Sequence, residues 1–200
     1  MKKILINFFV VFLIIIAFMI PYCTRTLNRA TVLDEDAIAK WSQVENNYER
    51  RYDLIPNLVA TVKGYASHEE RVLTEITEKR ASIGQIKLSA DDLTNPEKVE
   101  AFRKAQSELS GALSRLMAVA ENYPDLKANE NFLSLQSQLE GTENRIAVAR
   151  KDYIEAVREY NKFLRMIPQK WILSMFGDFE KKSEYKIDEA KKAVPQVKFD

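Results

Sequence analysis

The stretch that decides the fold is FLSLQSQLEGTENRIAVARKDYIEAVREYNKFLRMI, residues 132–167. Its apolar side chains recur at alternating steps of three and four residues, which predicts one long helix buried along one side. Asn129 can cap its start and Pro168 ends it. At 1.5 Å per residue the helix is about 50 Å long, so it needs other long helices to cover its apolar side. The stripe comprises Phe132, Leu135, Leu139, Thr142, Ile146, Ala149, Tyr153, Ala156, Tyr160, Phe163 and Ile167.

The composition of the 200-residue chain is typical of one all-α domain, with only five glycines and six prolines. Its 30 basic and 29 acidic residues alternate in sign along the chain. Because a nucleic-acid-binding face needs an excess of basic residues, this pattern argues against nucleic-acid binding. The single cysteine, Cys23, cannot form an internal disulfide. We interpret it as a small residue at a membrane interface, with palmitoylation as the alternative.

Residues 4–20 predict a transmembrane anchor, because they contain only one polar residue. Their helix would be about 25 Å long, which is at the short limit for a span. Lys2 and Lys3 at one end, and Tyr22 and Arg25 at the other, can extend its reach into both interfaces. The segment Ile4–Ile20 is therefore expected to contact the lipid bilayer.

A cleaved signal peptide is the alternative to this anchor, but no small-x-small cleavage site precedes Cys23. Three positive charges precede the span, counting the amino group, and two follow it at Arg25 and Arg29. The positive-inside rule then places the bulk of the chain outside the cytoplasm, by one charge.

A second apolar stripe predicts a helix over residues 34–66. The pattern passes through Pro56 in register, which favours one helix kinked near Ile55 over two helices with Asp53 capping the second. The stripe comprises Ile38, Trp41, Glu45, Tyr48, Tyr52, Ile55, Val59, Val62 and Ala66.

Two further helices complete the predicted fold. One begins at a capping box made by Ser67 and Glu70 and fades near Lys87. After a loop over residues 88–94, the other begins within Thr94-Asn95-Pro96-Glu97 and runs to about Glu121. The predicted architecture is a long antiparallel four-helix bundle behind an N-terminal transmembrane helix. Its parts are a cytoplasmic tip and anchor (1–24), a linker (25–33), the bundle (34–167), and a C-terminal capping segment and tail (168–200).

The chain beyond Pro168 begins with a short apolar cluster. We expect it to cover one end of the bundle; contact with lipid or with a partner is the alternative, because so apolar a cluster is rarely left in water. Residues 183–193 predict a short charged helix, and residues 195–199 an extended tail. The cluster comprises Trp171, Ile172, Leu173, Met175 and Phe176.

Two long blocks carry a resemblance to a known family. They are WSQVENNYERRYDLIPNLVATVKGYASHE, residues 41–69, and YPDLKANENFLSLQSQLEGTENRIAVARKDYIEAVREYN, residues 123–161. Together with the PQVKF ending at residues 195–199, they resemble the LemA family of bacterial membrane-anchored proteins. The polar segment usual after the anchor in that family is less clear here, at residues 26–32.

The resemblance implies a helical bundle behind one N-terminal span in a bacterial membrane, and a molecular function that is unsettled for the family. A member in magnetic bacteria is associated with building an internal membrane compartment, which implies a role in membrane organisation. Proteins that often accompany members of the family are TPM-domain proteins and membrane metalloproteases, so the resemblance implies these as envelope partners.

Residues with catalytic or metal-binding chemistry are sparse in this sequence. His68 is the only histidine, and the sequence His68-Glu69-Glu70-Arg71-Val72 lacks the second histidine of the zinc-protease helix. We interpret His68 as a polar turn residue. The sequence predicts no catalytic residues, no cofactor and no metal site.

Polar residues inside the apolar stripes are the sites that the sequence singles out. Glu45 and Thr142 occupy stripe positions, and a carboxylate in a bundle core needs a basic partner. We expect a structural pair that fixes helix register, with a proton-binding or ligand site as the alternative. The candidates are Glu45, Arg51, Thr142, Glu143, Arg145 and Arg150.

Three functional hypotheses follow. The first is a non-enzymatic, membrane-anchored scaffold or adaptor of the bacterial envelope. The second is a membrane-shaping protein that forms homo-oligomers and bends lipid. The third, the least favoured, is an enzyme with a carboxylate site around Glu45 and Glu143.

Overall fold

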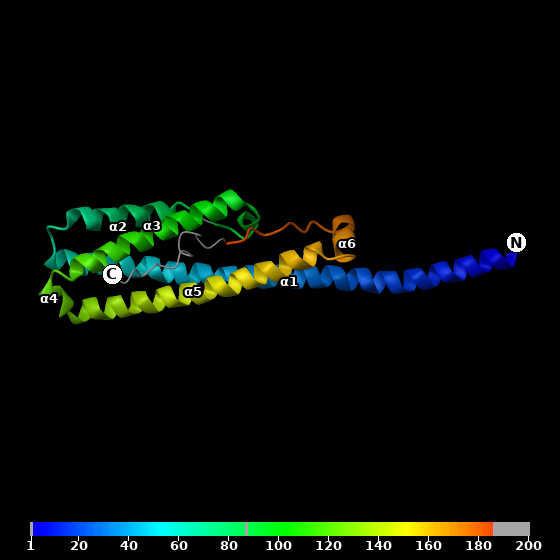
Figure 1. The fold of residues 1–200 in the computed structure, drawn as a ribbon, viewed down its shortest axis with the longest axis horizontal. Coiled ribbons are helices and arrows are strands. Elements are labelled where there is room, and N and C mark those ends of the chain that lie inside the picture. Colours follow the sequence, from blue (N-terminus) through cyan, green and yellow to red (C-terminus); the bar gives the residue numbers. More distant parts are fainter. Residues whose placement is uncertain (1, 87, 186–200) are drawn as a thin grey trace, which may run out of the picture. The chain divides into compact units, whose positions relative to one another are not determined.

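The computed structural model describes residues 2–86 and 88–185, and within them the protein is helical, with no strand (Figure 1). The all-α prediction is confirmed. The elements are α1 (Lys2–Tyr65), α2 (Glu70–Gly84), the 3₁₀ helix η1 (Asp91–Thr94), α3 (Pro96–Ala120), α4 (Pro124–Lys127), α5 (Glu130–Arg165) and α6 (Gln169–Phe176).

The contacts within the chain group its residues into two compact units. Of the described residues, unit 1 holds 2–51 and 139–182, and unit 2 holds the remainder. The prediction of a single four-helix bundle stays a prediction, and each unit is described by itself below.

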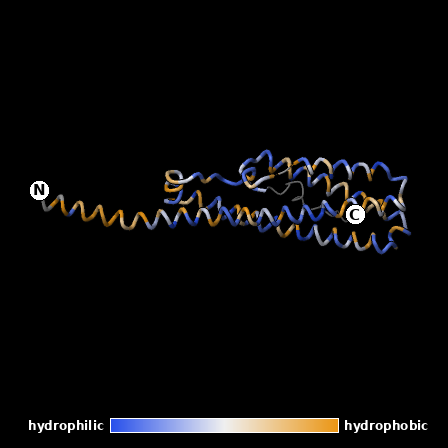
Figure 2. The backbone as a smooth tube through the Cα atoms, turned by 180° about the vertical axis from the view of Figure 1, so that it is seen from behind, coloured by the Kyte–Doolittle hydropathy of each residue, from blue (hydrophilic) through white to orange (hydrophobic). Residues whose placement is uncertain are grey.

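Helix α1 begins with the apolar segment and continues without a break. Among the described residues, α1 is the one helix long and apolar enough to cross a membrane, and its apolar residues lie in its N-terminal part (Figure 2). The large apolar side chains from Phe8 to Ile15 and from Phe18 to Ile20 are exposed. Residues 25–33, predicted as a linker, are helical instead. They contain neither glycine nor proline, and the hydroxyls of Thr26 and Thr31 donate to the carbonyls of Tyr22 and Leu27, one turn back.

Unit 1 is built on an antiparallel pair formed by α1 and α5. The ring centroids of Trp41 and Tyr153 lie 5.2 Å apart, and Arg51 Nη1 lies 2.6 Å from Glu143 Oε1. A step of ten residues forward along α1 is thus matched by ten residues back along α5. The side chains buried between them follow the predicted spacing on α5, including Thr142. Leu135 and Phe163 of the predicted stripe are half-buried, and the stripe fails at its end, where Ile167 is exposed.

The N-terminal caps of two helices match the sequence prediction. The side chain of Asn95 accepts hydrogen bonds from the amides of Glu97 and Lys98, with Pro96 in the first turn of α3. The side chain of Asn129 accepts from the amide of Phe132 at 3.0 Å and so caps α5. Both asparagines therefore set where their helices begin.

Unit 2 also shows how α1 continues through Pro56. Proline has no amide hydrogen, so the carbonyl of Tyr52 loses its helical donor. Arg80 Nε on α2 donates to that carbonyl at 3.2 Å, and its guanidinium lies 3.8 Å from the centre of the Tyr52 ring. Arg80 thus supplies the hydrogen bond that proline removes.

Three local predictions differ from the structure. The capping box of Ser67 and Glu70 does not form: Glu69 holds the cap position of α2 without a side-chain cap, and its carboxylate accepts from the Tyr123 hydroxyl instead. The loop over residues 88–94 contains η1, whose Leu93 is buried. The helix predicted over residues 183–193 is absent from its first three residues, where Ser183 donates to the Leu93 carbonyl at 2.7 Å. The rest of that helix and the 195–199 tail lie outside the described residues.

Candidate functional site

The charged centre predicted from the sequence exists in unit 1, but the buried charge is an arginine. Arg51 is only 1% exposed, and its Nη1 donates to Glu143 Oε1 at 2.6 Å, whereas the Glu143 side chain is 42% exposed. The Arg51 guanidinium also lies 5.0 Å from the centre of the Tyr48 ring, one turn back on α1. The carboxylate and the ring face together stabilise a charge that would otherwise be costly to bury.

Glu45 was predicted to be the buried carboxylate, and this prediction is wrong. Glu45 is exposed, and its neighbour Val44 takes the buried position. Positions three and four residues after Trp41 lie on opposite flanks of the same helix face, so the sequence pattern alone permits either one. Partial desolvation, followed by the charge of Glu49, raises the pKa of the Glu45 carboxyl.

The other candidates lie on α5 around the same centre. Thr142 is fully buried, as predicted, and its hydroxyl oxygen accepts a hydrogen bond from Arg145 Nη2 at 3.1 Å. Arg145 is exposed, and Arg150 is partly buried farther along the helix. The structure thus brings together Arg51 with Glu143, and Thr142 with Arg145.

A second charged centre in unit 1 was missed by the sequence analysis. Lys182 is only 5% exposed, and its ammonium lies 2.9 Å from an Asp34 carboxylate oxygen and 5.5 Å from the centre of the Tyr160 ring. Its backbone exchanges two hydrogen bonds with the side chain of Asn161. Burial, followed by the Asp34 charge, raises the pKa of Tyr160. The only signal in the sequence was Asn161, a polar residue beside the α5 stripe.

These two charged centres hold helices together and do not resemble a catalytic arrangement. Each joins a buried cation to a partly exposed carboxylate on another element, and each lies against an aromatic ring. The hydroxyl of Tyr153 is buried, and burial raises the pKa of this phenol. Among the described residues, no group of three or more His, Cys, Asp and Glu side chains could hold a metal ion.

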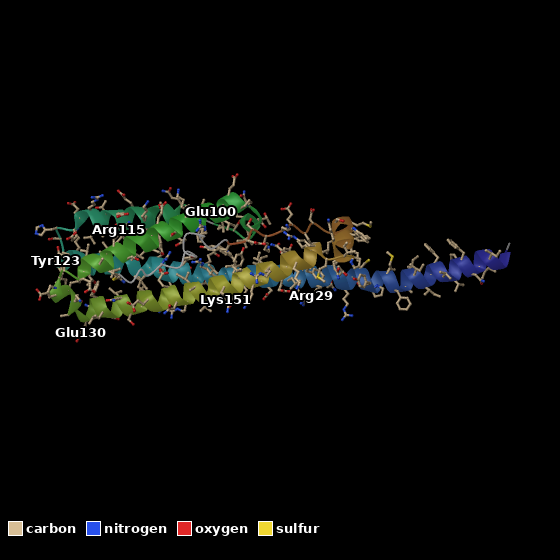
Figure 3. All side chains as sticks on the ribbon, viewed as in Figure 1. Arg29, Glu100, Arg115, Tyr123, Glu130 and Lys151 are labelled. Atoms are coloured by element: carbon tan, nitrogen blue, oxygen red, sulfur yellow. The ribbon has the colours of Figure 1, made fainter. Side chains whose placement is uncertain are left out.

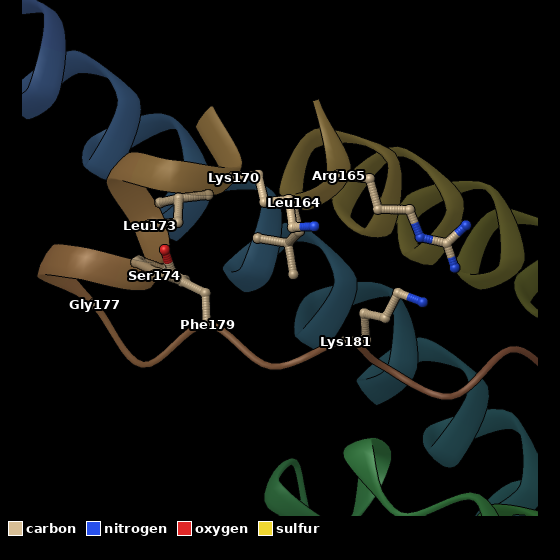
Figure 4. A pocket seen from close by; sticks show the side chains of 8 residues that line it. All are labelled: Leu164, Arg165, Lys170, Leu173, Ser174, Gly177, Phe179 and Lys181. Atoms are coloured by element: carbon tan, nitrogen blue, oxygen red, sulfur yellow. The ribbon is translucent and has the colours of Figure 1, made fainter. Parts of the chain in front are cut away.

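The end of unit 1 nearest the apolar segment carries two pockets, each lined in part by residues of α6. One of about 600 Å³ is bounded by the end of α5, by α6 and by the segment that follows (Figure 4). It is lined by three cations, Arg165, Lys170 and Lys181, and otherwise by mainly apolar side chains. The other, of about 430 Å³, is lined by residues of α1, of the end of α5 and of the start of α6, among them Arg25 and Arg29. Figure 3 labels Arg29 on α1.

Comparison with known proteins agrees with the resemblance carried by the two long sequence blocks. The magnetosome proteins MamQ 1 and MamQ 2 of Paramagnetospirillum magneticum are each 28% identical to this chain over 187 residues, covering 86% of this chain and 68% of their own length. Magnetosome protein MamQ of Magnetospirillum gryphiswaldense is 27% identical over 166 residues, covering 75% of this chain and 61% of its own length. In this chain, the apolar helix near the N-terminus fits a membrane-anchored protein. Residues 40–199 match the LemA family, and the chain therefore belongs to that family.

Proposed function

We propose that this protein is a membrane-anchored, non-enzymatic scaffold or adaptor of the bacterial envelope, with its packed helices outside the cytoplasm. The observation that carries the proposal is the join between the apolar segment and unit 1. Thr26, only six residues after the apolar run ends at Ile20, is already buried in the packed part of unit 1. The same helix continues through both, so the packed helices are held at a fixed height and orientation above the bilayer.

The charged groups inside unit 1 support a structural role. The cations of Arg51 and Lys182 are each engaged by a carboxylate and an aromatic ring. A general acid or base would instead need an ionisable group aimed at a substrate position. A scaffold needs rigid elements that present a surface, and paired buried charges provide such rigidity by fixing helix register.

The side of the membrane is the first thing to test, because the partners depend on it. The experiment places a cysteine at exposed Lys104 in a Cys23→Ser background and labels intact cells with a membrane-impermeant thiol reagent. Labelling of intact cells supports the extracytoplasmic placement and directs the partner search to periplasmic or surface proteins. Labelling only after permeabilisation contradicts it.

The scaffold role itself is tested by site-specific photo-crosslinking in cells. A photoreactive residue at Lys104 should give discrete crosslinks to other envelope proteins, such as a TPM-domain protein or a membrane metalloprotease. A matched site at exposed Val148 on α5 shows whether a crosslink belongs to one face of the protein. Identical faint smears at both sites, without discrete products, would argue against a scaffold.

A membrane-shaping homo-oligomer is the second candidate, and the relatives that are magnetosome proteins by name support it. It predicts self-crosslinking at these sites and deformation of liposomes by the purified protein in electron micrographs. A monodisperse monomer that leaves vesicles spherical would exclude this candidate and leave the scaffold in place.

A further inference from the structure

Helix α6 exposes most of its large apolar side chains to solvent and buries only one of them in unit 1. Leu173 is buried against the unit, whereas Trp171 is 62% exposed, Met175 74% and Phe176 57%. Two large apolar residues just before the helix, Met166 and Ile167, are exposed as well. We name these five residues the α6 apolar face. Several large apolar side chains exposed together around one short helix mark an interaction surface.

The position of α6 on α1 indicates what covers this face. Gln169 Nε2, at the start of α6, lies 3.5 Å from the Tyr22 hydroxyl, and the Gly177 position, at its end, lies against Leu27. The apolar run of α1 ends at Ile20, so these contacts lie within about 10 Å of that end at 1.5 Å per residue. Headgroup layers occupy the 5 to 8 Å or so beyond the hydrocarbon core. The level of α6 on α1 is therefore the membrane interface.

The direction of α6 is that of a helix lying on a membrane. It has little extent along α1 and is turned across it in both views (Figures 1 and 2). When the apolar segment spans a bilayer, a helix turned across it lies near the membrane plane. Interfacial helices adopt this orientation and bury their apolar side about 5–10 Å into the boundary between headgroups and acyl chains. Tryptophan is enriched at that depth.

The charges around α6 fit an anionic lipid surface. Arg165, Lys170 and Lys181 line the first pocket, and the side chains of Arg165 and Lys181 extend in the same direction (Figure 4). Arg25 and Arg29 line the second pocket, which Gln169 at the start of α6 also borders. Asp178 and Glu180, in the segment after α6, are exposed to solvent and line neither pocket. Cations beside an interfacial helix attract phosphate headgroups.

We propose that α6 is a second membrane contact, which inserts its apolar face into the same interface from which α1 emerges and binds anionic phospholipid headgroups through the flanking cations. The level of α6 beside the end of the apolar segment, its exposed apolar side chains and the cations that line both pockets carry the proposal. A scaffold tethered by one span would not need this second contact, through which α6 would respond to the lipid composition of the membrane.

The test uses the two tryptophans of the full chain, reconstituted in phosphatidylcholine vesicles containing phosphatidylglycerol. Trp41→Phe leaves Trp171 as the reporter, and Trp171→Phe leaves Trp41, which is buried inside unit 1 and serves as the matched control. Phosphatidylcholine brominated near the headgroup should quench most of the Trp171 emission and leave Trp41 emission unchanged. Equal quenching of both tryptophans, or of neither, overturns the proposal.

A second measurement, which does not alter Trp41, tests the proposal even if Trp41→Phe disturbs the core. In a Cys23→Ser background, a polarity-sensitive dye on Met175→Cys should shift its emission to the blue in vesicles, and brominated lipid should quench it. The same dye on Val148→Cys, another exposed apolar position of unit 1, should show neither effect. A blue shift at residue 175 without lipid quenching would assign the face to a protein partner or a second copy, and so refute the lipid assignment.

The role of the cations is tested in the same vesicles. Replacing Arg165, Lys170 and Lys181 by glutamine should weaken the preference of the protein for spin-labelled phosphatidylglycerol over spin-labelled phosphatidylcholine, with Arg25 and Arg29 still in place. A triple substitution of Lys151, Arg158 and Lys162 by glutamine, exposed cations of the same unit, is the charge-matched control and should retain that preference. If both variants lost the preference for phosphatidylglycerol equally, the preference would depend only on net charge, and the proposed headgroup site would be overturned.

Discussion

Removing the Glu143 carboxylate is expected to destabilise the protein more than removing the Arg51 charge that it pairs with. The reason is their unequal burial: Arg51 is 1% exposed, whereas Glu143 is 42% exposed. Glu143→Ala leaves a guanidinium buried without its carboxylate. Arg51→Met leaves a carboxylate that water can solvate, and it keeps apolar volume at the buried position.

The magnitudes follow from this asymmetry. Breaking a buried ion pair by removing one partner costs about 3–5 kcal/mol, and the partial exposure of Glu143 places Glu143→Ala at about 3 kcal/mol. Arg51→Met should cost about 1 kcal/mol, because the remaining carboxylate is solvated. One kcal/mol corresponds to about 2–4 °C in a chain of this size, so Glu143→Ala should lower the Tm by about 6–12 °C.

The assay is thermal unfolding of the full chain in detergent micelles, followed by far-ultraviolet circular dichroism. Glu155→Ala, at an exposed glutamate of the same helix, is the control for helix propensity and surface charge. The double variant Arg51→Met/Glu143→Ala should be about as stable as Arg51→Met alone, because no buried charge is left to strand. A Tm for Glu143→Ala equal to that of the control, or a larger loss for Arg51→Met, would refute this account.

Three further substitutions test other contacts. Glu45→Gln should raise the free energy of unfolding at neutral pH by less than about 0.5 kcal/mol, since desolvation and Glu49 raise the pKa of this carboxyl from 4.5. A raised folded-state pKa gives a stabilising contribution that is present below the unfolded pKa and lost as pH rises through the folded one, so the gain should vanish near about pH 4 in denaturant titrations; a gain that persisted there would contradict the argument. Asn95→Ala should cost about 1 kcal/mol and speed hydrogen exchange in the first turn of α3, whereas unchanged exchange would show that the cap contributes nothing. Asp34→Ala should cost about 2–3 kcal/mol and exceed Lys182→Met in thermal unfolding, because the lysine is the more buried partner; the reverse order would refute this assignment.

The predictions that rest on local sequence signals are the most accurate. The period of the stripe at residues 132–167 determines α5, because each turn must place apolar groups on one side. Asn95 with Pro96, and Asn129, determine where α3 and α5 begin, because a cap acts within its own turn. The apolar run at residues 4–20, which contains one polar residue, determines the candidate membrane helix in the same way.

The identity of the buried charge was decided by tertiary structure. After Trp41 and again after Tyr48, the positions three and four residues on flank the same face, and the sequence offered Val44 or Glu45, then Arg51 or Tyr52. Tyr52 is the more apolar choice, but the structure buries Arg51, because Glu143 on α5 lies within 2.6 Å of it. A partner about ninety residues away in the chain leaves no mark in the local period.

Lys182 and α6 give the same lesson. Lysine is ordinarily exposed, and only the arrival of Asp34, Asn161 and Tyr160 from two helices makes its burial favourable. The apolar residues after Pro168 could be predicted as buried or as partner-binding from sequence, and only the fold shows that one of them packs while its neighbours stay exposed beside Tyr22 and Leu27. The sequence thus predicted the long helices and where two of them begin, since these depend on neighbours within a turn, although it missed that residues 25–33 are helical. The tertiary structure decided which charges are buried and which face is left open, because both depend on groups that only folding brings together.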